Sequence, residues 1–193
     1  MDRLSVLAMA AAAVQQTENP QSTRDFSIRK ARFADIAFLG PVERSAAEIF
    51  RTANLDFLVD GSTVDPKVLA AMIDAQHLWV ACDFMEHPIG FSGGEYIEGN
   101  FHLVEISVAQ DFQGKGVGRA LMERMEADVR REGYKAMTLT TYRSLAWNGP
   151  WYSRMGFAEV NPVQMGRTYL GILENERQHG FDMSARCVMR KIL

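Results

Sequence analysis

The sequence contains few of the residues that cross-link small domains or bind metals. Its 193 residues include two cysteines, Cys82 and Cys187, and four scattered histidines. No C-x-x-C pair occurs, so we expect no structural zinc, no other metal site and no disulfide framework. Both cysteines lie in apolar, strand-like runs. We therefore expect buried free thiols in a reducing compartment, which favours a cytoplasmic protein.

Long hydrophobic runs and a strong excess of one charge are also missing. No apolar run reaches the length needed to cross a bilayer. The net charge of −3 argues against general binding to nucleic acid or to membrane surfaces, and we expect neither as a partner. An anionic ligand must then be attracted by a local group of cations. Hydrophobic residues make up 47% of the chain, which lets one domain bury a core without cross-links.

Residues 1–25 are expected to form an extension ahead of a single domain that spans residues 26–193. The first 14 residues, MDRLSVLAMAAAAV, place one arginine before an alanine-rich stretch and so have a faint likeness to a secretory signal. Because Asp2 offsets the arginine and alanine replaces the usual leucine, we favour a short helix. Residues 15–24 are polar and contain a proline, which is typical of a linker.

The rest of the chain alternates between strand-like and helix-like segments. The expected strands are residues 27–33, 77–85, 89–97, 101–108, 136–142, 157–160 and 184–192. The expected helices are residues 34–51 with an interruption near Gly40-Pro41, 65–76, 117–130, 148–155 and 168–178, with a loop at 56–62. The second to fourth strands predict an antiparallel meander, with a bulge or close approach at Gly93-Gly94. The fifth strand should lie parallel to the fourth by a right-handed crossover.

A glycine-rich turn lies between the fourth strand and the longest helix. It reads Gln113-Gly114-Lys115-Gly116-Val117-Gly118-Arg119. Glycines let the backbone approach a ligand closely, and the first turn of a helix has unbonded N–H groups and a dipole that favours negative charge. Lys115 and Arg119 add positive charge. The segment predicts a phosphate site, and a glycine-rich turn without a ligand remains the alternative.

Two well-known phosphate loops do not fit this segment. The pattern G-x-x-x-x-G-K-[ST] requires serine or threonine after the lysine, but Gly116 follows Lys115. The pattern G-x-G-x-x-G requires a third glycine where Arg119 or Leu121 stands. The remaining pattern, Q-x-x-G-x-G, resembles the pyrophosphate loop of the GNAT superfamily of N-acetyltransferases, which binds acetyl-coenzyme A (acetyl-CoA).

A second segment carries the same resemblance. Residues 148–157, NGPWYSRMGF, are similar to the family segment that follows the fifth strand, with Tyr152 and then Gly156-Phe157. The order of elements matches over about residues 27–193. One departure is Gln110, where the family often has a proline that shapes the turn. The resemblance implies an α/β fold: a mixed, mostly antiparallel sheet of six to seven strands, helices on both faces, and splayed fourth and fifth strands.

The resemblance also implies which residues bind acetyl-CoA. In the family, the pantetheine arm lies between the splayed strands and pairs with the fourth strand, so the Val108 N–H is aimed at the thioester carbonyl. The pyrophosphate takes N–H groups from residues 113–118, and Asn148 holds the arm, directly or through water. The full expected set is Ile106, Ser107, Val108, Gln113, Gly114, Lys115, Gly116, Val117, Gly118, Arg119 and Asn148.

Tyr152 occupies the position where the family commonly places its general acid. A phenol with a pKa near 10 is protonated at neutral pH and can give its proton to a thiolate. A plain core tyrosine is the alternative. Members of this family often act as dimers, so the resemblance also allows a homodimer.

Glu105 is the best candidate for the general base. A carboxylate in an apolar strand is costly unless it is hydrogen-bonded or opens on a cleft, and partial burial raises its pKa. A structural carboxylate and a water chain are the alternatives, and Glu95 is the reserve. By strand alternation, Glu105 should share a face with Leu103 and Ser107, with His102 opposite as a satisfied core residue.

The acceptor is less well defined by the sequence. In this fold residues 50–64 usually wall the acceptor site, and they include Asp56 and Asp60, which can attract an ammonium group. Trp147, Trp151 and Tyr142 are candidates for an aromatic lining. We expect transfer of an acetyl group from acetyl-CoA to a primary amine of a small molecule or peptide, by direct attack in a ternary complex, because no cysteine lies near either motif. The alternative is a non-catalytic acyl-CoA sensor, and the acyl-chain length stays open.

Overall fold

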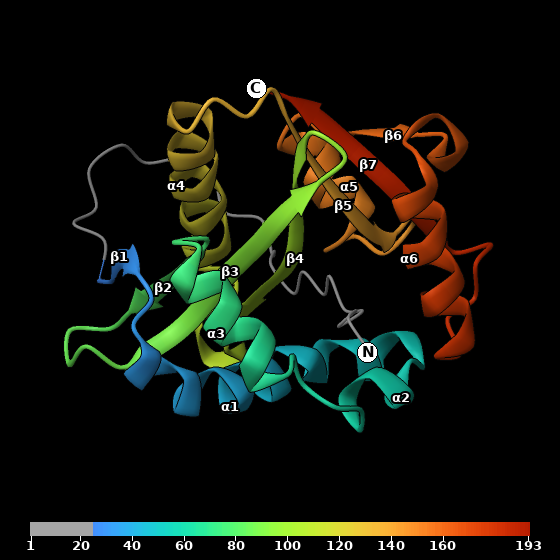
Figure 1. Ribbon diagram of the computed structural model, residues 1–193. Helices are drawn as coiled ribbons and strands as arrows, with labels where there is room; N and C mark the ends of the chain where they lie inside the picture. The colour runs from blue at the N-terminus through green and yellow to red at the C-terminus, as the bar shows by residue number, and fades with distance from the viewer. Residues whose placement is uncertain (1–24) are drawn as a thin grey trace.

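The structure, a computed structural model, describes residues 25–193 and places seven strands in one sheet (Figure 1). The strands are β1 (Ser27–Lys30), β2 (Leu78–Cys82), β3 (Pro88–Ile97), β4 (Asn100–Val108), β5 (Ala136–Tyr142), β6 (Ala158–Val160) and β7 (Arg186–Ile192). The α-helices are α1 (Ile36–Ala47), α2 (Asp56–Val59), α3 (Pro66–Asp74), α4 (Val117–Arg131), α5 (Gly149–Arg154) and α6 (Arg167–Gln178). The short 3-10 helices are η1 (Phe33–Asp35), η2 (Glu48–Ala53), η3 (Gln110–Phe112) and η4 (Pro162–Gln164). The predictions for residues 1–24 lie outside the described residues.

The sheet has the order β1-β2-β3-β4-β5-β7-β6. All neighbouring strands are antiparallel except β4 and β5, which are parallel. The predicted meander and the predicted parallel crossover are therefore confirmed. Cys82 and Cys187 lie in β2 and β7 as buried free thiols. Between residues 25 and 193, no helix is both long enough and apolar enough to span a membrane.

Helices cover both faces of the sheet. Helix α4 packs its apolar stripe, including the fully buried Leu121 and Met125, against one face. Helices α1 and α3 cover the other face through residues such as Leu39 and Leu69. The predicted fold class, with its mixed sheet between helical layers, is confirmed.

Two local predictions in the first third of the chain are wrong. Helix α1 runs through Pro41 without the expected interruption. Pro41 lacks one helical N–H bond, but Leu39 and Val42 on either side are buried against the sheet, and this packing holds the helix together. Residues 56–62 were expected to be a loop, yet Asp56–Val59 form a helical turn because Leu58 is buried under it.

The predicted irregularity at Gly93-Gly94 is a bulge. Gly93 lies opposite Glu105 and Gly94 opposite Leu103, so Val104 is an extra residue in β4. A Cβ at Gly94 would overlap the carbonyl oxygen of the facing strand, which explains the glycine. The bulge keeps β4 paired with β3 while it changes which side chains share a face.

This change of face corrects the predicted alternation in β4. Leu103 packs in the α4-side cluster together with Ile106, whereas Val104 packs in the cluster on the opposite face. Leu103 and Glu105 therefore lie on opposite faces of the sheet, and the prediction that they share one is wrong. His102 alternates with Leu103, so it shares the face of Glu105 instead of opposing it.

Candidate active site

Strands β4 and β5 separate after a short paired segment. They pair only at Phe101 with Met137 and at His102 with Thr138. Beyond these pairs β4 continues to Val108 without a partner on the β5 side, and Figure 1 shows the two strands diverging. The predicted splay is confirmed, and it leaves one edge of β4 unpaired.

The end of β4 presents backbone polar groups to this unpaired edge. The Ala109 N–H donates to the Ile89 carbonyl oxygen at 2.9 Å, and Val108 lies opposite Gly90. In an antiparallel pair, hydrogen-bonded and non-hydrogen-bonded residues alternate. The N–H and carbonyl groups of Val108 and Ile106 therefore point away from β3, toward the separation, where an extended ligand can add to the strand.

The turn after β4 leaves several N–H groups free of helical partners. Gly114 and Gly116 adopt positive φ angles of 74° and 82°, a conformation that favours glycine. The Gly116 carbonyl is the first acceptor of α4, bonded by the Ala120 N–H at 3.0 Å. The N–H groups of residues 117–119, in the first turn of α4, therefore have no intrahelical partner. A Cβ at Gly116 would meet nothing within 4 Å, so this turn is open on its outer side.

Gln113 has a supporting position in this turn. Its side-chain amide donates to the Val108 carbonyl oxygen at 3.0 Å and to the Ala46 carbonyl oxygen at 3.3 Å. Its own N–H is bonded to the Gln110 carbonyl oxygen at 3.2 Å. Gln113 therefore fixes the turn to the end of β4, and the N–H groups available to a phosphate begin at Gly114.

Two cations flank the turn. Lys115 is exposed, with its Nζ 5.3 Å from the centre of the Phe112 ring. Arg119, also exposed, forms an ion pair with Glu123 one helical turn later at 2.9 Å. Together with the N–H groups they give this corner the local positive character that the whole chain lacks.

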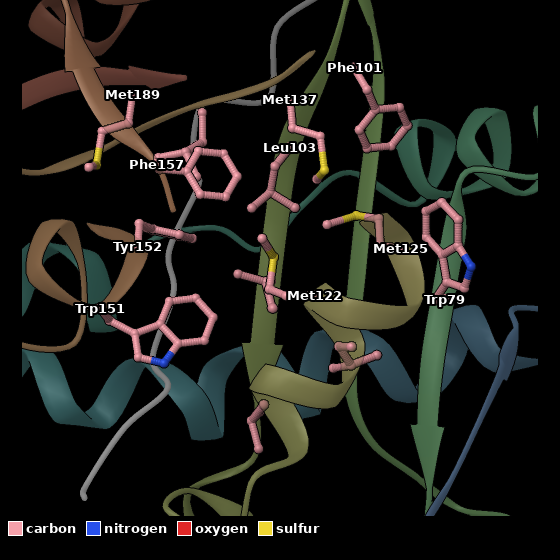
Figure 2. Close-up of a cluster of buried hydrophobic side chains, with 14 of the residues drawn as sticks. Trp79, Phe101, Leu103, Met122, Met125, Met137, Trp151, Tyr152, Phe157 and Met189 are labelled. Atoms are coloured by element: carbon pink, nitrogen blue, oxygen red, sulfur yellow. The ribbon is translucent and has the colours of Figure 1, made fainter. Parts of the chain in front are cut away.

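Tyr152 is fully buried in α5 and belongs to the same apolar cluster as Ile106 and Val108 of β4. Figure 2 shows it next to Trp151 and Phe157, in the cluster that also contains Leu103 and Met122. Within residues 25–193 its hydroxyl has no hydrogen-bond partner. Burial, and secondarily the charge of Glu105, raise the pKa of the phenol well above its usual value. The hydroxyl is therefore protonated at neutral pH and is a hydrogen-bond donor without an acceptor among residues 25–193.

Glu105 is fully buried and accepts a hydrogen bond from the Ser107 hydroxyl at 2.8 Å. The charge of Glu105 raises the pKa of Tyr152, so the two groups influence each other across the separation. Ser107 orients this carboxylate, and its backbone groups face β3 because it pairs with Phe91. Glu95, the reserve base, is exposed further along β3.

His102 is a satisfied core residue, as predicted. Its Nδ1 lies 3.1 Å from the Thr138 hydroxyl, and its ring packs against Tyr169 at 5.7 Å. Burial lowers the pKa of this histidine to about 4, which keeps it neutral and removes it from the catalytic candidates.

Asn148 is fully buried at the N-cap of α5. Its carbonyl oxygen accepts the Tyr152 N–H at 2.9 Å, while its side chain makes no capping bond. Through this backbone bond Asn148 fixes the start of the helix that carries Tyr152.

The residues that were predicted to surround the acceptor divide into an exposed charged group and a buried aromatic group. Asp56 and Asp60 are exposed and bond Arg51 at 2.9 and 3.0 Å. Tyr142 and Trp147 pack around Phe50 and belong to a cluster under η2 and α2. Trp151, also considered for this wall, instead packs with Tyr152 on the α4 side.

Glu43 is a buried acid that the sequence analysis missed. It lies in α1, and both carboxylate oxygens accept the Val64 N–H, at 3.2 and 3.0 Å. Burial raises its pKa to about 7, against the lowering effect of the Val64 N–H. Its position four residues after Leu39, on the apolar face of the helix, is the signal that could have identified it.

Replacing Glu43 with glutamine should make the free energy of unfolding less dependent on pH. The folded pKa lies above the unfolded value of 4.5, so the native state favours the protonated acid. The contribution of Glu43 to the free energy of unfolding is fully present below about pH 4.5. It is lost as the pH rises through about 7, and the total loss is roughly 3 kcal/mol. Urea midpoints at about pH 5 and pH 8 should therefore converge in Glu43→Gln, whereas parallel pH profiles for both proteins would contradict this account.

Comparison with known families and structures agrees with this geometry. The acetyltransferase (GNAT) domain family matches residues 74–159, which include β4, the glycine-rich turn and α5. A stretch of 63 residues is 40% identical to N-alpha-acetyltransferase 80 from Mus musculus. That stretch covers 32% of this chain and 19%, about a fifth, of that relative.

Solved structures share the fold at low identity. PaiA N-acetyltransferase from Thermoplasma acidophilum, in complex with coenzyme A, gives a TM-score of 0.64 at 16% identity and covers 87% of this chain and 99% of that one. The ribosomal-protein-S18-alanine N-acetyltransferase from Escherichia coli gives 0.60 at 16% identity, covering 86% of this chain and 93% of that one. The family match over residues 74–159 includes both sequence motifs and agrees with the GNAT resemblance that they carry.

Proposed function

We propose that this protein is an acetyl-CoA-dependent N-acetyltransferase that acts on a primary amine of a small molecule or peptide. The observation that carries the proposal is the unpaired edge of β4, which runs directly into a turn with free N–H groups and two cations. Coenzyme A has an amide-rich arm that can pair with the edge of β4. It also has a pyrophosphate that can bind the N–H groups and the cations of the turn. Relatives crystallised with coenzyme A support the same co-substrate. A cytoplasmic location stays a prediction.

Acetyl-CoA supplies an activated acetyl group as a thioester. Ile106 and Val108 would pair with its arm, and the Val108 N–H would stabilise the carbonyl oxygen as negative charge develops there. Residues 114–119 would hold the pyrophosphate, with Gln113 fixing their turn. Asn148 would contact the arm from the start of α5.

The two remaining groups, Glu105 and Tyr152, would carry out the proton transfers. The C–N bond forms as the neutral amine attacks the carbonyl carbon, and the C–S bond then breaks. Glu105 would accept the proton that the amine loses, directly or through water. Tyr152 would give its proton to the departing thiolate. A ternary complex suffices, because Cys82 and Cys187 are both buried and burial raises the pKa of each thiol, which disfavours the thiolate that a covalent route would need.

A non-catalytic acyl-CoA sensor is the second candidate. It would need the turn and the β4 edge but neither Glu105 nor Tyr152. Among residues 25–193 the protonated Tyr152 hydroxyl has no hydrogen-bond partner, which favours the enzyme, because a structural tyrosine normally bonds its hydroxyl. Thiol release with a panel of amines separates the two, since a sensor binds acetyl-CoA and releases no thiol with any amine.

Removing either cation of the turn should weaken coenzyme A binding. Lys115→Ala and Arg119→Ala should each raise the Kd by about 5-fold at low salt, since unit charges about 4 Å apart in water interact by about 1 kcal/mol. The difference should shrink as salt is added. Calorimetry with coenzyme A measures both effects. Arg130→Ala, which removes an exposed arginine from the far end of the same helix, is the matched control and should bind as the wild type does.

A further inference from the structure

Helix α1 holds the segment between β4 and the glycine-rich turn at two points. The Gln110 N–H donates to the Ser45 hydroxyl oxygen at 3.0 Å, and the Gln113 side-chain amide donates to the Ala46 carbonyl oxygen at 3.3 Å. Gln110 is the first residue of η3, and Gln113 is the residue that follows this short helix. Both ends of η3 are therefore fixed to two neighbouring residues near the end of α1.

These bonds satisfy backbone groups at the ends of the two helices. The first N–H groups of a helix have no intrahelical acceptor, and Ala109, the N-cap of η3, has no side chain that can accept them. The last carbonyls of an α-helix likewise lack intrahelical donors, and α1 ends at Ala47. The Ser45 hydroxyl therefore caps the start of η3 from a distant part of the chain.

The position of Gln110 determines the position of the glycine-rich turn through the backbone. The Gln110 carbonyl oxygen accepts the Gln113 N–H at 3.2 Å, and the Ala109 carbonyl oxygen accepts the Phe112 N–H at 2.8 Å. Gly114, with its positive φ of 74°, follows directly. A displacement of Gln110 therefore also displaces the turn whose N–H groups would hold the pyrophosphate.

We propose that Ser45 is a positioning residue for coenzyme binding, which holds Gln110 so that the N–H groups of residues 114–119 keep the geometry that a pyrophosphate requires. This inference rests on the proposed coenzyme site and assigns Ser45 no contact with coenzyme or acceptor. Because the bond joins residues 65 positions apart, it restrains the turn against the rest of the domain, which bonds within the turn cannot do. When fewer of the free molecules have the binding conformation, the apparent Kd rises in proportion.

Replacing Ser45 with alanine should raise the Kd for coenzyme A by about 5-fold, the factor that corresponds to the loss of one hydrogen bond. Calorimetry with coenzyme A measures the Kd, and urea unfolding of the same preparation shows that the variant is folded. Thr168→Val is the matched control. The Thr168 hydroxyl also ties a helix to a distant turn, because it donates to Glu98, between β3 and β4, at 2.6 Å. This variant should lower the urea midpoint and leave the Kd unchanged.

Gln110→Pro in the Ser45→Ala background tests whether restraint of the turn is what Ser45 provides. Ala109 has φ of −52° and ψ of 141°, the extended conformation that a proline requires of the residue before it. Proline is also tolerated at the first position of a helix, and its ring fixes φ without any hydrogen bond. The double variant should therefore bind coenzyme A within about 2-fold of the wild type.

A Kd for Ser45→Ala equal to that of the wild type would overturn the inference, as would an equal rise in Thr168→Val. A double variant that binds as weakly as Ser45→Ala would also overturn it, because restraint of the turn would then not restore binding. In each case the binding of coenzyme A by the wild type leaves the proposed function standing. If the wild type itself bound no coenzyme A, the proposed function would fail and the inference with it, so the two failures are distinguishable.

Discussion

Replacing Tyr152 with phenylalanine should lower kcat for acetyl transfer by about 10²- to 10⁴-fold and leave the free energy of unfolding unchanged or higher. The variant loses the proton donor for the thiolate. It keeps the ring contacts with Trp151 and Phe157, at 4.9 and 5.7 Å between ring centres. Stability should not fall, because the buried hydroxyl has no partner within residues 25–193 to lose. Thiol release and urea unfolding on the same preparation measure both outcomes.

Tyr169 provides the matched control for this prediction. It is equally buried, but its hydroxyl lies 2.9 Å from the Thr138 hydroxyl and 3.3 Å from the Asn100 amide. Tyr169→Phe should therefore cost roughly 1–3 kcal/mol of stability and leave kcat unchanged. If Tyr152→Phe were as active as the wild type, or if it lost stability as Tyr169→Phe does, Tyr152 would be a structural tyrosine.

Replacing Arg186 with methionine should reduce the free energy of unfolding by about 3–5 kcal/mol. Arg186 and Glu176 form a buried pair with two short bonds, at 2.6 and 2.8 Å, and Thr140 bonds the same carboxylate. Removing only the arginine leaves a buried carboxylate without its counter-ion. The double variant Arg186→Met, Glu176→Met should recover most of the loss, because an apolar pair fills the site without charge.

An exposed ion pair on α6, the helix that carries Glu176, is the control. Arg177 bonds Glu174 at 2.6 Å on the surface of α6, and Arg177→Met should leave the urea midpoint nearly unchanged. A small effect of Arg186→Met, similar to that of the surface variant, would contradict the view that this buried pair braces Tyr142 and Phe181.

The two sequence motifs predicted the part of the fold that contains the candidate active site. The glycine-rich turn and the segment around Tyr152 are short stretches of sequence whose conformation follows from glycine, helix start and strand signals. Their positions in the structure match the predicted context, between β4 and α4 and after β5. The splay of β4 and β5, which the family resemblance implied, is visible in the two-pair register. The binding roles assigned to these residues stay predictions.

Other features depend on contacts between distant segments and were missed or mistaken. The bulge at Val104 is a property of the β3–β4 pair, so alternation within one strand assigned the wrong faces to Leu103 and His102. Helix α1 continues through Pro41 because tertiary packing outweighs the local cost of proline. The burial of Glu43 depends on Val64, which lies 21 residues later in the chain.

The unbonded donors could not be predicted from the sequence at all. Tyr142 and Trp147 were candidates for an aromatic lining, and the structure places both rings next to Phe50, while the lining role stays a prediction. That their polar atoms are buried without partners among residues 25–193 is known only once the neighbouring segments are placed. The ion pairs of Asp56 and Asp60 were not predicted either, because their partner Arg51 lies in a separate helix, η2.

The central claim is that the N–H groups of the turn after β4 hold the pyrophosphate of coenzyme A. The most direct test is an amide NMR titration of isotope-labelled protein with coenzyme A. We expect the signals of residues 114–119 and of Val108 to shift together and to saturate at one coenzyme per chain. Shifts confined to other parts of the protein, or none in this turn at a large excess of coenzyme, would contradict the claim.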